Sequence, residues 1–170
     1  MEIKEIESNI SKVPDYPKPG ILFYDISTLI FNKDAFSSSI KKLTDKVKDY
    51  EFDLIASIDA RGFLFGSALA YSLGKGLVMV RKKSKLPGKT ISYDYELEYG
   101  IDTLEINIEA KGKKFLLVDD LLATGGTANA ALELIKKAGG DTSCFLSLIE
   151  LTFLNGRKKI QVPMESLIQY

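Results

Sequence analysis

The chain has 170 residues, enough for one domain with a substantial core, and its 45% hydrophobic content is ordinary for a soluble globular protein. Its 23 basic and 23 acidic residues cancel, so the net charge gives no general attraction for nucleic acid or an anionic membrane. The chain has no histidine, which excludes histidine-ligated metal sites and histidine-dependent catalytic triads.

The apolar runs and the single cysteine bear on the compartment. No apolar run reaches the roughly 18 residues of a membrane span, and the charged N-terminus MEIKEIESNI lacks the apolar core of a signal peptide. Cys144 rules out an internal disulfide and lies in an apolar run, which predicts a buried, inert thiol. These features together predict a cytoplasmic protein.

The first part of the chain predicts two helices joined by a loop. An apolar stripe from Ile3 to Val13 has helical spacing, and the segment 14–20 carries three prolines and a glycine, which is typical of a loop. A second stripe from Phe36 to Val47 predicts another helix, capped near Asn32 or Asp34.

The rest of the chain alternates between strands and helices. We expect strands at 54–58, 76–80, 113–118 and 143–151, helices at 63–73 and 128–138, a hairpin of 92–97 with 103–108, and an edge strand in 163–170. This alternation predicts an α/β fold with a mainly parallel central sheet covered by helices on both faces. With no repeat or linker visible, residues 1–170 are expected to form a single domain.

Charged residues follow several of the predicted strands. Arg61, Arg81 and the pair Asp119-Asp120 each come directly after one. Because ligands of such sheets bind beyond the carboxyl ends of the strands, we expect these side chains to gather on one rim.

The run FLLVDDLLATGGT, residues 115–127, combines two kinds of binding chemistry. The turn after the strand can present backbone N–H groups and two hydroxyls to a phosphate at a helix N-terminus. Asp119 and Asp120 would repel a phosphate but suit sugar hydroxyls or a divalent metal. A phosphorylated sugar satisfies both halves, although a Gly-Gly turn taken alone is more often only a helix cap. No Walker A lysine follows, and the chain has no G-x-G-x-x-G, which disfavours a nucleoside triphosphatase or dinucleotide fold.

Two basic features admit both structural and functional interpretations. The cluster at residues 81–89 is either a solvated loop or an anion site, and its place after a strand favours the second. Arg61 either pairs with Asp59 or offers its planar donors to pyrophosphate.

Five separated motifs resemble the type I phosphoribosyltransferases, in the family's usual order. They are ARGFLFG at 60–66, RKKSKLPG at 81–88, YELEYG at 95–100, DDLLATGGT at 119–127 and ELTFLNGRKKI at 150–160. The segment DDLLATGGT resembles the form of this signature found in adenine phosphoribosyltransferases. These enzymes transfer the phosphoribosyl group of 5-phosphoribosyl 1-pyrophosphate (PRPP) to adenine, giving AMP and pyrophosphate. The resemblance therefore implies a transferase of purine salvage with a phosphoribosyltransferase fold.

The resemblance also implies roles for individual residues. The phosphate and ribose of PRPP or AMP would be bound by Asp119, Asp120, Ala123, Thr124, Gly125, Gly126 and Thr127. The pyrophosphate would be bound by Arg61, Arg81 and Lys85, and the adenine by Leu22, Phe23 and Tyr24. Glu98 would be the acid of a hood over the site, with Tyr99 in the lid, and the catalytic set would be Glu98, Arg61, Asp119 and Asp120.

The long segment 82–102 contains a Pro-Gly pair and is expected to act as the lid. Tyr24 and Thr28 depart from the family, which commonly has a basic residue and a proline there, so adenine would be read by the main chain.

The implied cofactor is Mg²⁺, carried by the substrate, with Asp119 and Asp120 as candidate ligands. The implied partners are adenine and PRPP, no nucleic acid or membrane, and a second copy of the chain in a homodimer. Two alternatives stay open: a related transferase acting on an oxopurine base, and a non-catalytic PRPP-binding regulator.

Overall fold

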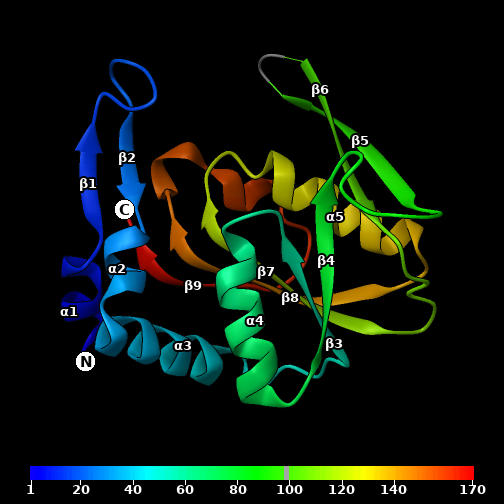
Figure 1. Ribbon diagram of the computed structural model, residues 1–170, viewed down its shortest axis with the longest axis horizontal. Helices are drawn as coiled ribbons and strands as arrows, with labels where there is room; N and C mark the ends of the chain where they lie inside the picture. The colour runs from blue at the N-terminus through cyan, green and yellow to red at the C-terminus, as the bar shows by residue number, and fades with distance from the viewer. Residues whose placement is uncertain (98–99) are drawn as a thin grey trace. The chain divides into compact units, whose positions relative to one another are not determined.

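The computed structural model describes residues 1–97 and 100–170, and it divides into two compact units, residues 1–42 and 43–170 (Figure 1). The expectation that the whole chain acts as one domain stays a prediction. No helix among the described residues combines the length and the apolarity that a membrane crossing requires.

The first unit contains a small antiparallel sheet between short helices. Its elements are α1 Ile3–Ser8, β1 Ser11–Pro14, β2 Leu22–Asp25, α2 Ser27–Phe31 and the start of α3 Lys33–Val47. The prediction of one helix from Ile3 to Val13 was therefore wrong beyond Ser8, because Val13 lies in β1 opposite Phe23 of β2. Pro14 explains the error: a residue that precedes proline is disfavoured in helical geometry and prefers an extended one.

The start of α3 agrees with its predicted cap. Asn32 Oδ1 accepts hydrogen bonds from the backbone N–H groups of Asp34 at 3.0 Å and Ala35 at 3.1 Å. These bonds satisfy donors that have no partner inside the helix. The short helix α2, directly before this cap, was not predicted.

The second unit is built on a seven-stranded sheet of order β5-β6-β4-β3-β7-β8-β9. Strands β4, β3, β7, β8 and β9 run parallel, whereas β6 and β5 are antiparallel additions at one edge. The predicted α/β fold with a mainly parallel sheet, the hairpin and the C-terminal edge strand are confirmed. The strands are β3 Leu54–Ile58, β4 Gly76–Lys82, β5 Ile91–Leu97, β6 Gly100–Ile106, β7 Lys114–Leu122, β8 Asp141–Glu150 and β9 Met164–Gln169.

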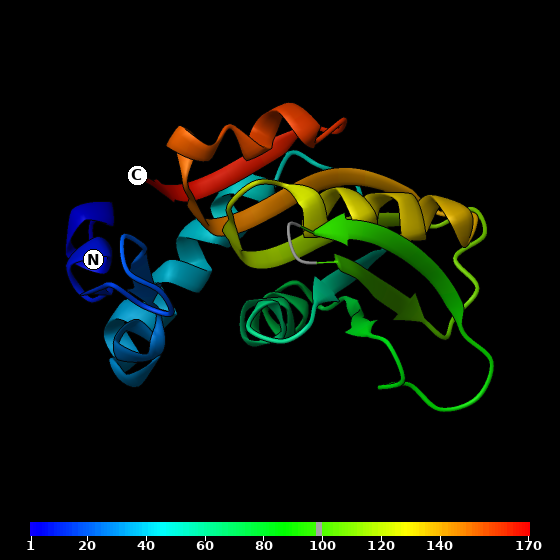
Figure 2. The same ribbon diagram turned by 90° about the horizontal axis from the view of Figure 1, so that it is seen from above.

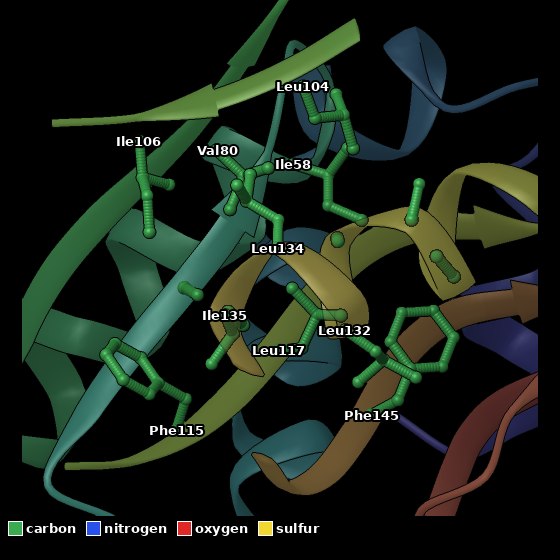
Figure 3. Close-up of a cluster of buried hydrophobic side chains, with 14 of the residues drawn as sticks. Ile58, Val80, Leu104, Ile106, Phe115, Leu117, Leu132, Leu134, Ile135 and Phe145 are labelled. Atoms are coloured by element: carbon green, nitrogen blue, oxygen red, sulfur yellow. The ribbon is translucent and has the colours of Figure 1, made fainter. Parts of the chain in front are cut away.

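Helices α4 Gly62–Leu73 and α5 Gly126–Lys137 cover opposite faces of this sheet (Figure 2). The side chains of β3 point alternately to the two faces of the sheet, so each helix packs on a different set of them. Ser57 faces α4, where a Cβ at Gly66 would lie only 2.4 Å from its Oγ, whereas Ala56 and Ile58 belong to the apolar core that includes Leu134 of α5. Figure 3 shows Ile58, Leu117 and Leu134 within this core.

Two strands are longer than predicted at the ends that matter for the site. Strand β7 continues through Leu122, which pairs with Glu150 of β8, and β4 continues to Lys82, which pairs with Leu104 of β6. Asp119, Asp120 and Arg81 therefore lie within the last residues of strands rather than after them. Extended backbone fixes which way each of these neighbouring side chains points.

After β8 the chain forms two short 3-10 helices, η1 Thr152–Leu154 and η2 Gly156–Lys159, before it enters β9.

Candidate active site

A cavity of about 430 Å³ opens at the carboxyl ends of β3, β4 and β7 in the second unit. This is the rim on which the sequence predicts a ligand site. Three segments of chain line it: residues 58–61 from the last residue of β3 onward, Lys82 at the end of β4, and residues 119–128 from β7 into α5.

Asp119 and Asp120 both line this cavity, although neither is freely solvated. Asp119 Oδ1 accepts a hydrogen bond of 2.8 Å from the backbone N–H of Asp120, and Asp120 is buried. Burial, reinforced by the charge of Asp120, raises the pKa of Asp119 well above its ordinary value. Burial also raises the pKa of Asp120, although the Arg61 guanidinium opposes this shift. Burial thus makes the charge of each carboxylate costly, and hydroxyl donors or a cation that enter the cavity would lower this cost.

Arg81 and Arg61 each form an ion pair with an aspartate of another segment. Arg81 Nε donates to Asp59 Oδ2 at 2.9 Å, and Arg61 Nε forms an ion pair with Asp120 Oδ2, also at 2.9 Å. Asp59 is therefore bonded to Arg81 of the neighbouring strand, and Arg61 reaches across to β7. Arg61 lines the cavity, but Arg81 is not among its lining residues.

The turn between β7 and α5 has the geometry of an anion site. Gly125 has a φ of +81°, which a residue with a side chain rarely adopts, and α5 begins at Gly126. The first backbone N–H groups of a helix have no acceptor inside it, and they carry the positive end of its dipole. Ala123, Thr124, Gly125, Gly126 and Thr127 all line the cavity.

Lys82 is a cavity residue that the sequence did not single out from the basic cluster. Its ammonium group bonds to the carboxylate of Asp102 and lies 3.3 Å from Tyr95 Oη. Burial alone would lower the pKa of Lys82, but these two hydrogen bonds raise it. Tyr95 Oη also lies 3.4 Å from Thr127 Oγ1, so the β5–β6 hairpin is linked to the start of α5.

The other predicted site residues are not among the residues that line this cavity or fall outside the described chain. Lys85 is exposed in the turn after β4. Leu22, Phe23 and Tyr24 form most of β2 in the first unit, where the Phe23 ring makes an edge contact with Tyr16 at 5.0 Å between centroids. Glu98 and Tyr99 fall outside the described residues.

The donor set of the cavity fits a metal that arrives with its substrate. Among the described residues, histidine, cysteine, aspartate and glutamate form no group of three that would hold a cation by themselves. Mg²⁺ is commonly bound through one or two carboxylates together with substrate phosphates. Asp119 and Asp120 supply that number of carboxylates.

Comparisons with known proteins identify the family of this chain. Residues 30–159 match the family model of the phosphoribosyl transferase domain. An adenine phosphoribosyltransferase of Rhodospirillum centenum is 50% identical over 168 residues, covering 98% of each chain. One of Thermoanaerobacter sp. is 51% identical over 173 residues, covering 100% of each chain.

Solved structures give the same result. The adenine phosphoribosyltransferase of Thermoanaerobacter pseudethanolicus superposes with a TM-score of 0.96 at 48% identity, covering 99% of this chain and 100% of that one. The enzyme of Saccharomyces cerevisiae, complexed with an imino-altritol bisphosphate and adenine, has a TM-score of 0.91 at 37% identity and 97% coverage of both chains. This chain therefore belongs to the phosphoribosyltransferases and, within them, to the adenine phosphoribosyltransferase family.

Proposed function

We propose that the protein transfers the 5-phosphoribosyl group of PRPP to adenine, giving AMP and pyrophosphate. The observation that carries the proposal is that two carboxylates, Asp119 and Asp120, and the N-terminus of α5 line the same cavity. The full-length similarity to adenine phosphoribosyltransferases, one of them complexed with adenine, favours this base over an oxopurine.

The 5-phosphate is assigned to the turn from Ala123 to Thr127. Backbone N–H groups at the helix N-terminus attract the dianion, and the hydroxyls of Thr124 and Thr127 add donors. Asp119 and Asp120 then accept hydrogen bonds from the ribose hydroxyls, which relieves the cost of burying the two charges. The phosphate of a phosphorylated sugar thus meets N–H and hydroxyl donors, and its ribose hydroxyls meet carboxylate acceptors.

Pyrophosphate departure needs positive charge, because the ribose carbon becomes oxocarbenium-like while the leaving group gains electrons. We assign that charge to Arg61, Arg81 and Lys85. Lys82 joins them in the proposal because it lines the cavity. Mg²⁺, bound with PRPP and held by Asp119 and Asp120, would supply further charge neutralisation when present.

The base is assigned to Leu22, Phe23 and Tyr24, with ring stacking on Phe23 and main-chain recognition of the adenine edge. The Tyr24 side chain is buried, which favours main-chain over side-chain recognition at that position. Glu98 would position the purine or accept the proton released as its imidazole nitrogen attacks, and Tyr99 would belong to the lid.

The proposal includes a homodimer in the cytoplasm. Leu77 and Met79 of β4 point to the face that α4 covers and remain 36% and 44% exposed, and Leu64 and Tyr71 of α4 are 45% and 92% exposed. An apolar surface of this kind suits burial against a second copy. Sedimentation of the active protein as a monomer would refute this part.

Turnover with a panel of bases tests the proposal. The protein is incubated with PRPP, Mg²⁺ and adenine, hypoxanthine, guanine or xanthine in turn, and nucleotide formation is followed by chromatography. We expect AMP and pyrophosphate with adenine and little product with the oxopurines, whose carbonyl replaces the amine. Product from an oxopurine alone would reassign the base, and no product from any base would refute the transferase activity.

A further inference from the structure

A second glycine turn packs directly against the phosphate-binding turn, backbone against backbone. A Cβ built on Gly125 would lie 2.5 Å from the carbonyl oxygen of Gly156. A Cβ built on Gly156 would lie 2.1 Å from the carbonyl oxygen of Ala123 and 3.0 Å from the backbone nitrogen of Gly125. No room remains for a side chain on either residue.

At Gly156 it is the close approach of the neighbouring backbone, and not the backbone conformation, that requires glycine. Gly156 is not among the residues with positive φ, so its backbone conformation would accept alanine. The alanine methyl group would nevertheless overlap Ala123, and the overlapping atom belongs to the backbone, which has no rotamer with which to move away.

The Gly156 turn is held in place by its neighbour Arg157. Arg157 Nε and Nη2 bond to the two carboxylate oxygens of Glu150 at 2.8 and 2.5 Å, and Nη1 donates to the carbonyl of Met164 at 3.1 Å. Glu150 is only 3% exposed, and Ser166 Oγ also donates to it at 2.7 Å. The turn is therefore tied to the ends of both β8 and β9.

A further bond connects the same region to the strand that precedes the phosphate-binding turn. The backbone N–H of Leu151, next to Glu150, donates to the carbonyl of Leu122 at 2.9 Å. The two segments that carry Gly125 and Gly156 thus leave the sheet from neighbouring, hydrogen-bonded positions at its rim.

We propose that Gly156, fixed by the Arg157–Glu150 pair, is the positioning residue of the phosphate-binding turn. The inference rests on the proposed function, since it takes the turn at Ala123 to Thr127 as the site of the 5-phosphate. Gly156 supports the turn from behind and fixes the distance between its backbone N–H groups and the ligand. Gly156 is not among the residues that line the cavity, so it acts through the turn.

The proposal predicts a particular kinetic pattern. The 5-phosphate is held equally in the ground state and the transition state, so displacing its cradle weakens uniform binding. Gly156→Ala should raise KM for PRPP about tenfold or more with kcat largely retained. The affinity for AMP, measured directly by calorimetry, should weaken by a similar factor.

A matched control separates this effect from general overpacking. A Cβ at Gly140, which follows the C-terminus of α5, would lie 2.8 Å from the Phe115 ring and 3.0 Å from Ala110 Cβ. Gly140→Ala should therefore lower thermal stability as Gly156→Ala does, but it should leave AMP affinity unchanged. If Gly156→Ala fails to fold, Arg157→Lys serves instead, because lysine keeps the charge but loses the double bond to Glu150. A smaller loss of AMP affinity is expected there.

The outcomes are distinct. Weaker AMP binding in Gly156→Ala but not in Gly140→Ala supports the proposal. Equal AMP affinity in wild type and Gly156→Ala, or equal weakening in both alanine variants, overturns it while leaving the proposed function intact. Wild-type protein that binds no AMP overturns the proposed function, and this inference with it.

Discussion

Arg61 Nε lies 2.9 Å from Asp120 Oδ2, an ion pair that joins the N-terminus of α4 to the last residues of β7 at the cavity. The Asp120 side chain is 7% exposed and that of Arg61 is 41% exposed. Asp120 is thus buried, whereas the Arg61 side chain is partly exposed to solvent.

Replacing Arg61 should lower both activity and stability. Arg61→Met leaves Asp120 buried without its counter-charge, and the cost to the free energy of unfolding should be about 1–2 kcal/mol, since Arg61 is partly solvated. Turnover should fall by about two orders of magnitude because the pyrophosphate loses a cation. Arg61→Lys, which keeps the charge without the planar donors, should be intermediate in both steady-state kinetics and urea denaturation. Wild-type turnover in Arg61→Met would contradict the assignment.

Asp119→Asn should separate stability from function. Burial raises the pKa of Asp119, so its ionisation destabilises the fold as pH rises above the ordinary carboxyl pKa, and the full cost is present above the raised pKa. The amide removes that cost while its oxygen still accepts the Asp120 N–H bond. At pH 8 we expect a gain of about 1 kcal/mol, or about 2–4 °C in Tm, with most turnover lost. The gain should vanish in acid. A variant that is fully active would remove Asp119 from the ribose site.

Lys82 should matter for PRPP more than other lysines of the basic segment. It lines the cavity, so Lys82→Met should raise KM for PRPP about tenfold. Lys89 comes from the same segment, is exposed and is not a cavity-lining residue, so Lys89→Met is the matched control and should change KM little. Equal effects of the two substitutions would mean that the segment acts through its total charge.

Glu150 should give the protein part of its resistance to acid. The hydrogen bonds from Arg157 lower the pKa of Glu150, so the pair adds stability above the ordinary carboxyl pKa of 4.5 and loses it as pH falls through the lowered value. Glu150→Gln should cost about 1 kcal/mol at pH 7, a modest figure because Arg157 is half exposed. Denaturation at pH 3 should show a smaller difference between the two proteins. A constant difference at both pH values would argue against the charge-based account.

Gly66→Ala should destabilise the sheet without touching the chemistry. Its methyl group would approach Ser57 Oγ to 2.4 Å, an overlap worth about 1–3 kcal/mol. Because Ser57 supplies the overlapping atoms, the double variant Gly66→Ala with Ser57→Gly should recover part of that loss in a thermal melt. Additive losses in the double variant would show that the close approach is not the cause.

Local signals in the sequence predicted much of the fold and of the cavity. Asp119 to Thr127 are contiguous, so one strand, one turn and one helix N-terminus suffice to bring them together. The α/β pattern also follows from local periodicity. The helical spacing of Val13 was misleading, because this β-branched residue precedes Pro14 and lies in a strand.

The remaining features depend on register between strands, which local patterns do not contain. Whether Asp59 pairs with Arg61 or Arg81 depends on how β3 aligns with β4. One further residue of extended strand decides that Lys82 rather than Arg81 lines the cavity, because neighbours in a strand point to opposite faces. The contact of Gly125 with Gly156 joins segments far apart in the chain, and only the folded backbone reveals it.

A crystal structure of the protein with AMP would show whether the two carboxylates and the helix N-terminus bind one phosphorylated sugar together. We expect the 5-phosphate within hydrogen-bond distance of the backbone of Thr124 to Thr127 and the ribose hydroxyls against Asp119 and Asp120. A nucleotide bound outside this cavity, or with its phosphate away from the turn, would contradict it.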